Sequence, residues 1–237
     1  MGARKVVAIH QPNFFPWLGY FDKICRADLF VYLDHVENNP RDPLWTKRVK
    51  IIASNGESWL TVPLVRPKSS IFVPIKEMQV SPGYFERKHL KTIQQSYGKS
   101  PFFEAIMPMV EAFYASSNVY IANRNIQFIE ELCKQLGVTT QRVRSSEFTW
   151  KNKSTDLLIE ILEHFQATAY LSGGGASGYQ EDFKFAEFGF DLIYQRFCHP
   201  TYEQRDTEEF HPGLSIIDVL MNCGFEGTEK LLKTGKS

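Results

Sequence analysis

The sequence VVAIHQPNFFPWLGYFDKICRADLFVYLD, residues 6–34, decides the fold. Its first four residues are apolar and mostly β-branched, which is typical of a buried strand, and a proline soon ends the run. The middle of the stretch carries Leu18, Phe21 and Ile24 at helical spacing. A second apolar run, residues 29–33, closes it. We therefore predict a βαβ unit with two adjacent parallel strands, each buried on both faces.

The rest of the chain extends this unit into an α/β fold. Short apolar runs predict strands at 50–52, 59–62, 75–80, 142–145, 168–171 and 192–195. Helical periodicity predicts helices at 84–96, 101–115, 119–136, 153–165, 214–222 and 227–233. An Asn-Gly pair at 55–56 is typical of a hairpin turn. We predict one domain, residues 1–237, with a Rossmann-like open parallel sheet, an antiparallel hairpin and a helical lobe near 84–140.

The composition excludes several classes of protein. The 237 residues are 43% hydrophobic and 23% charged, as in an ordinary globular protein. Because 27 basic residues balance 27 acidic ones, there is no electrostatic footprint for duplex nucleic acid. No apolar run approaches the roughly 20 residues of a membrane span, and the first one is too short for a signal peptide. Four scattered cysteines favour free thiols. We expect a cytoplasmic protein.

Three polar loops directly follow predicted strands, at residues 10–20, 34–48 and 172–179. Because ligands of an open parallel sheet bind at the carboxyl ends of its strands, these loops are expected to form the active site. His10 ends the first strand, where an imidazole can act as a general acid or base, or can instead pin its loop through a backbone carbonyl. Asp34, after the second strand, is expected to orient or bind the substrate.

The other candidates are residues that could contact a substrate. The glycine run after Ser172 lacks the Walker and dinucleotide spacings, but it can hold an anion or carbonyl, or serve as a structural turn. Basic clusters near Arg48 and His89 could grip a diphosphate, or form a solvated charged face. The predicted substrate-binding residues are Gln11, Asn13, Trp17, Gly19, Tyr20, Arg48, His89, Ser172, Gly173, Gly175 and His199. No spacing indicates a metal site, and no cofactor is identified.

Several motifs resemble those of the WbqC-like family, whose genes often lie among bacterial surface-polysaccharide genes. They are IHQPNFFPWLGYF at 9–21, WLTVP at 59–63, YLSG at 170–173, FCHP at 197–200 and LSIID at 214–218. The resemblance covers nearly the whole chain. It implies a transferase of O-antigen-like polysaccharide biosynthesis that acts on a sugar or nucleotide-sugar, with transfer of an amino-acyl group such as glycine as one proposed activity.

A weaker likeness concerns residues 17–20 and the nucleotidyltransferases whose H-x-G-H motif opens the helix after the first strand. Gly19 is shared and allows close approach of a nucleotide, but Trp17 and Tyr20 replace the histidines that stabilise a phosphoryl transition state. Three readings therefore stay open. They are a glycan transferase with His10 as acid or base, an ATP-using nucleotidyl- or adenylyltransferase, and a non-catalytic ligand-binding or scaffold protein.

Overall fold

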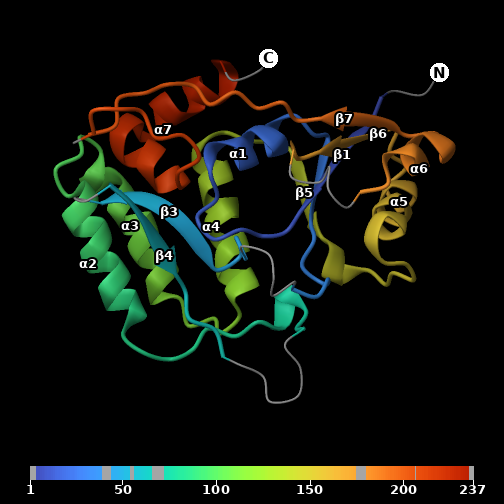
Figure 1. Ribbon diagram of the computed structural model, residues 1–237. Coiled ribbons are helices and arrows are strands. Elements are labelled where there is room, and N and C mark those ends of the chain that lie inside the picture. The colour runs from blue at the N-terminus through green and yellow to red at the C-terminus, as the bar shows by residue number, and fades with distance from the viewer. Residues whose placement is uncertain are drawn as a thin grey trace.

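The computed structural model describes residues 4–38, 44–53, 56–65, 72–174, 180–205 and 207–234. Its centre is a parallel sheet in the order β5-β2-β1-β6-β7 (Figure 1). The strands are β1 (Val6–His10), β2 (Leu29–Tyr32), β5 (Gln141–Arg144), β6 (Ala169–Ser172) and β7 (Asp191–Tyr194). Helix α1 (Leu18–Cys25) joins β1 to β2, which pair in parallel. The predicted βαβ unit is confirmed.

Helices cover both faces of this sheet, which explains why its strands are apolar throughout (Figure 1). Val7 and Ile9 of β1 lie in the core beneath α5 (Ser154–His164) and α6 (Asp182–Glu187). Ala8, between them, lies in the core on the other face, beneath α1 and α4 (Ile121–Gln135). Successive side chains of a strand point to opposite faces, so the alternation along β1 assigns each residue to one of the two layers.

A second group of elements stands beside the sheet on its α1 side (Figure 1). It comprises the antiparallel hairpin β3 (Arg48–Ala53) and β4 (Gly56–Thr61), and the helices α2 (Phe85–Tyr97), α3 (Phe103–Ala115) and α7 (Ile216–Thr234). The predicted hairpin and these helices are confirmed, and Gly137, at a φ of 65°, follows the end of α4 as expected. The single-domain organisation stays a prediction.

Residues 75–80 do not form the strand that their apolar pattern predicted. Ile75–Glu77 is a 3-10 turn, and the rest makes isolated bridges to Leu64 and Tyr120. Because each short piece bonds to a different neighbour, no partner strand runs alongside and no ladder grows. The two predicted C-terminal helices are both present: α7 contains them, and they are separated by a break at Gly224, whose φ is 67°.

Two further features bear on the class of protein. None of the helices in the described parts of the chain has both the length and the apolar composition that crossing a bilayer requires. None of the four cysteines, all of which lie in the described ranges, forms a disulfide bond. The short helix α6, which no sequence signal indicated, covers the sheet next to β7.

Candidate functional site

The strand order of the parallel sheet reverses between β1 and β6. From β1 the sheet continues to β2 and β5 on one side, and to β6 and β7 on the other. The recorded pairing of β1 with β6 ends at Ala8↔Leu171, one residue before the last residue of β6. Open parallel sheets bind ligands outside the carboxyl ends of the strands at such a point. We call this place, formed by residues 9–10 and 172–173, the fork.

His10 stands at the tip of β1, half-buried. Its Nδ1 lies 3.1 Å from the carbonyl oxygen of Gln11, and its ring meets the ring of Tyr20 edge-on at 4.9 Å. The Tyr20 hydroxyl donates to the same carbonyl at 3.0 Å. The Nδ1–H tautomer satisfies that carbonyl, so Nε2 is left as an acceptor. Burial, followed by the charge of Lys23, lowers the pKa of His10 to about 3, so the ring is neutral at pH 7.

Lys23, which the sequence analysis missed, reaches the fork from α1. The residue is only 2% exposed. Its Nζ donates to the carbonyl oxygen of Ile9 at 2.9 Å and lies 6.0 Å from the centroid of the Tyr170 ring. A Cβ built on Gly173 would lie 3.8 Å from the same nitrogen. Burial lowers the pKa of Lys23 to about 7.

The sequence signal for Lys23 was present but ambiguous. The apolar stripe of α1 indicated one buried face, and a lysine off that stripe is normally solvated. In the structure α1 has no solvated face at this point, because Asp22 and Ile24 on either side of Lys23 are buried as well. A lysine in the first helix after β1, close in space to the switch point, is the feature that sequence reasoning could have selected.

Asp34 is fully buried, and donors at the end of β5 surround its carboxylate. Oδ2 accepts from Arg144 Nε at 2.8 Å, from Arg144 Nη2 at 2.7 Å and from the Ser146 hydroxyl at 2.8 Å. Oδ1 accepts from the Ser146 amide at 2.9 Å and from the Ser145 hydroxyl at 3.2 Å. A carboxylate bound in this way ties the ends of β2 and β5 together and is poorly placed to take a proton from a substrate.

The loop from β1 to α1, which contains the candidates Gln11 and Asn13, is held by its backbone. The buried Asn125 of α4 donates through Nδ2 to the carbonyl of Pro12 at 3.0 Å and to that of Thr46 at 2.7 Å. Asn13 is buried and Gln11 half-buried. The loop is therefore a fixed element that sets the position of His10.

Phe15, in the same loop, adopts a φ of 41°, which is uncommon for a residue other than glycine. Its ring lies 4.6 Å from that of Phe113 and 4.6 Å from that of Phe128, measured between centroids. This aromatic cage holds the strained residue in place. The strain lies five residues after His10, in the loop that begins at the fork.

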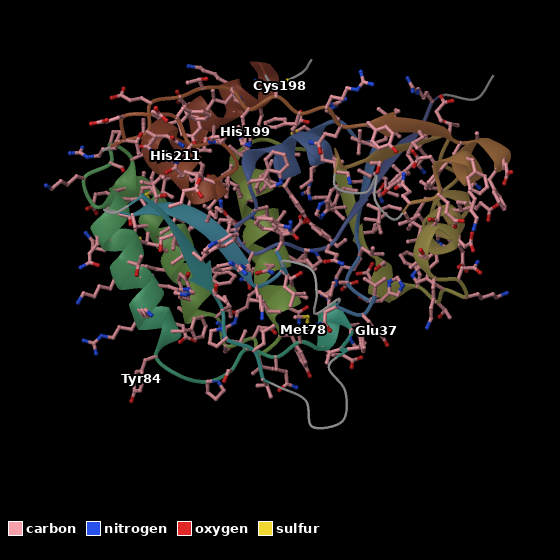
Figure 2. All side chains as sticks on the ribbon, in the orientation of Figure 1. Glu37, Met78, Tyr84, Cys198, His199 and His211 are labelled. Carbon is pink, nitrogen blue, oxygen red and sulfur yellow. The ribbon has the colours of Figure 1, made fainter. Side chains whose placement is uncertain are left out.

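Trp17, Gly19 and His199 gather at the start of α1 and close to α7, where Figure 2 shows His199. The Trp17 ring lies 5.3 Å from the Phe197 ring and 5.1 Å from the His199 ring. A Cβ on Gly19 would lie 2.3 Å from the Trp17 indole, so the missing side chain makes room for that indole. His199 Nε2 accepts from the Gly213 amide at 3.0 Å, and burial lowers the pKa of His199.

Ser172 and Gly173 end β6 at the fork. Ser172 is buried, and its hydroxyl donates to Oε1 of Gln180 at 3.2 Å. The alternation along β6 places Ser172 on the α5 face, whereas the alternation along β1 places His10 on the α1 face. Ser172 and His10 therefore point to opposite faces of the sheet and are not brought together, whereas a Cβ at Gly173 would lie 3.8 Å from the Lys23 amine. Gly175 lies outside the described residues.

Arg48 and His89 belong to the hairpin and α2, apart from the strands of the parallel sheet. The guanidinium carbon of Arg48 lies 3.7 Å from the centroid of the Trp59 ring. His89 is buried, its Nδ1 lies 3.0 Å from the Tyr114 hydroxyl, and burial lowers its pKa to about 4. His89 is thus a neutral, hydrogen-bonded residue of the helical core.

A family model described as the WbqC-like protein family matches residues 11–230. The chain belongs to this family. An uncharacterised protein of Mycobacterium tuberculosis is 30% identical over 234 residues, which cover 96% of this chain and 97% of that protein. Among solved structures, a zinc-bound AdcAII variant of Streptococcus pneumoniae aligns over 99% of this chain and 100% of that chain, with 14% identity and a TM-score of 0.20. That score is too low to bear on the fold.

The WbqC-like chain also holds a buried polar network that sequence reasoning missed. Asp218 of α7 is 1% exposed and accepts from the hydroxyls of Tyr97 at 2.9 Å and Tyr202 at 2.6 Å, and from Gln204 Nε2 at 3.1 Å. Burial raises the pKa of Asp218. The Tyr97 hydroxyl in turn accepts from the Ile52 amide at 3.2 Å. The network joins α7, α2 and β3.

In the described residues no metal cluster marks the fork, and a hollow between α3 and α4 lies apart from it. Across the described ranges, no group of three or more His, Cys, Asp or Glu residues is placed to hold a metal ion. An open hollow of about 860 Å³ lies between α3 and α4, lined among others by Pro108, Phe113, Phe128 and Arg142. The chemical case for the fork therefore rests on its side chains and on the topology of the sheet.

Proposed function

We propose that this WbqC-like protein is a transferase of bacterial surface-polysaccharide biosynthesis that acts on a sugar or nucleotide-sugar at the fork. One observation carries the proposal. A neutral imidazole with a free acceptor nitrogen, His10, stands at the topological switch point of an open parallel sheet. The family supports the biological setting, because the resemblance implies polysaccharide synthesis.

The geometry supports a simple role for His10. The Gln11 carbonyl holds the proton on Nδ1, and Nε2 can accept a proton from the hydroxyl or amine of the acceptor. As that proton moves to Nε2, the acceptor atom bonds to the transferred sugar or amino-acyl group, and the leaving group departs with the electrons of its former bond. An anion bound beside the imidazole raises the pKa of His10, so the base strengthens when the substrate is present.

The nucleotidyl-transfer alternative finds less support in the geometry. Close approach of a nucleotide at residues 17–20 would use the space next to Gly19, and the Trp17 indole occupies that space. A non-catalytic binding role would place a ligand at the same fork but would not need a titratable residue there. The two classes of function therefore differ in what they require of His10.

Substitution of His10 tests the proposal. His10→Gln keeps a polar side chain but removes the proton acceptor, and it is expected to lower turnover by about 10²–10⁴-fold with an unchanged melting temperature. The readout is the surface glycan of cells that lack the chromosomal gene and carry either variant. The matched control is His164→Gln, which changes an exposed histidine of α5. Full glycan modification by a stable His10→Gln protein would contradict the transferase mechanism.

A thermal-shift screen can identify the class of substrate that the protein binds. Nucleotides, nucleotide-sugars and amino-acyl donors are screened against the wild-type protein, since a ligand at 100 times its Kd stabilises the folded state by about 2.7 kcal/mol. We expect a nucleotide-sugar to give the largest shift. A shift by ATP alone would favour the nucleotidyl-transfer alternative.

A further inference from the structure

A lysine amine buried in the fork is the feature that leads beyond the proposed function. An ammonium group has three N–H donors, and burying a charge without a partner is costly. In the part of the chain that the structure describes, the carbonyl of Ile9 is the one hydrogen-bond acceptor that Lys23 Nζ meets. Within the described residues, the ammonium form of this side chain, which is 2% exposed, therefore has two N–H donors without an acceptor.

The amine stands where the sheet would otherwise continue. The Ala169 amide donates to the carbonyl of Lys5 at 3.1 Å, and each rung of a parallel ladder advances two residues on both strands. Two rungs further, the carbonyl of Ile9 would accept from the amide of Gly173. Lys23 Nζ takes that carbonyl instead, at 2.9 Å. The lysine thus occupies the opening between β1 and β6 where the strands part.

The surroundings of the amine leave room on one side. Gly173 has no side chain, and even an added Cβ would lie 3.8 Å from Nζ, at ordinary contact distance. The Tyr170 ring lies 6.0 Å away on the β6 side, and the His10 imidazole lies on the β1 side. The neighbouring carboxylate on α1, Asp22, is held by Gln195 Nε2 at 2.9 Å and Arg26 at 3.5 Å.

We propose that Lys23 is the anchor of an oxyanion site in the fork and binds a phosphate group of the substrate between β1 and β6. This deepens the proposed function and rests on it, because it identifies the donor as a phosphate-bearing molecule such as a nucleotide-sugar. The bound phosphate accepts hydrogen bonds from the two N–H groups of Lys23 that have no acceptor among the described residues, and it lies next to His10 Nε2. The same oxyanion chemistry could come from free phosphate, which the experiment separates.

Binding of an anion at this site should be linked to the uptake of a proton. Because burial lowers the pKa of Lys23 to about 7, most molecules carry a neutral amine at pH 8. A bound dianion favours the ammonium form, so binding must be accompanied by proton uptake. His10, the other titratable base at the fork, contributes uptake of the same sign if its pKa also rises. The Lys23 variant separates the two contributions.

The test is titration calorimetry at pH 8 with uridine diphosphate, pyrophosphate and inorganic phosphate, each in two buffers of different ionisation enthalpy. Wild-type protein is expected to bind the nucleoside diphosphate with uptake of about one proton. Lys23→Met, which keeps the length of the side chain without its charge, should bind at least about tenfold more weakly and without that proton. Lys230→Met, on the exposed side of α7, is the control and should behave as wild type.

Each result of the calorimetry supports or contradicts the phosphate site or the proposed function. Equal affinity for all three anions would assign the site to free phosphate, and failure of the wild type to bind any of them, or binding without proton uptake, would overturn it. Because proton uptake is measured on the wild type, the test does not depend on the variant folding. If Lys23→Met loses anion binding while the surface glycan is unchanged, the site stands and the proposed function fails. If Lys23→Met keeps anion binding but loses the surface glycan, the phosphate site is ruled out and the proposed function stands.

Discussion

Lys23 Nζ donates to the carbonyl oxygen of Ile9 at 2.9 Å, at the point where β1 and β6 stop pairing. A helix side chain thereby completes the hydrogen bonding of a strand end and brings a titratable amine next to His10. The fork is therefore an electrostatically coupled pair of groups.

Lys23 should make the stability of the protein rise with pH just above neutrality. The pKa of Lys23 is lowered from 10.5 to about 7 in the folded state, so between these values the unfolded chain holds a proton that the folded chain lacks. Raising the pH from 7 to about 8 then favours folding through this group, by up to about 1.4 kcal/mol per pH unit, whereas at higher pH the raised thiol pKa values of Cys133 and Cys223 act in the opposite direction. Lys23→Met should flatten this rise. Urea unfolding at several pH values measures it, and parallel curves for the two proteins would contradict the burial of the amine.

The stability should fall on the acid side for a related reason. The pKa of His10 is lowered from 6.5 to about 3, so between these values the unfolded chain again binds the extra proton, and lowering the pH favours unfolding. His10→Gln should lose less stability than wild type between pH 6.5 and 4. His89, with a pKa of about 4, acts with the same sign but is present in both proteins, so their difference isolates His10. The difference is measured as the change in urea midpoint with pH.

Asp34→Asn should destabilise the protein by at least about 3 kcal/mol, because it removes the charge that pairs with Arg144 and places an amide among five donors. The matched control is Asp156→Asn, which weakens an exposed ion pair with Lys184 at 2.8 Å and should cost at most about 1 kcal/mol. Both values come from chemical denaturation. Similar costs for the two variants would show that Asp34 is not the hub between β2 and β5.

Gly19→Ala should cost about 1–3 kcal/mol, because the new methyl group would meet the Trp17 indole at 2.3 Å. Gly83→Ala, where nothing lies within 4 Å of an added Cβ, is the control and should be close to neutral. The double variant Trp17→Ala with Gly19→Ala should lose less than the sum of the two single changes, since the clash is then gone. Strict additivity of the three melting curves would argue against the contact.

Much of the fold could be predicted from local patterns. The two apolar runs at 6–9 and 29–33, with a helix between them, indicated a parallel pair, because parallel strands need a long crossover and a helix usually supplies it. The Asn-Gly pair at 55–56 indicated a hairpin here, although Gly56 is already the first residue of β4 and Asn55 lies outside the described residues; Gly137 marked the end of α4. Residues 75–80 show where an apolar pattern does not determine the secondary structure. An apolar run predicts burial, but it becomes a strand only if a partner runs beside it.

The sequence by itself determined that His10 stands at a strand tip, because the apolar run that carries it ends there. Only the tertiary structure decided what surrounds it. The periodicity of α1 identifies its apolar stripe but cannot tell that the remaining face is covered too, and so Lys23 read as a surface residue. Likewise, no local pattern around Asp34 indicates that it pairs with Arg144, which lies 110 residues away along the chain. Whether a charged side chain has a partner depends on its neighbours in space, and those neighbours are set when distant strands come together in one sheet.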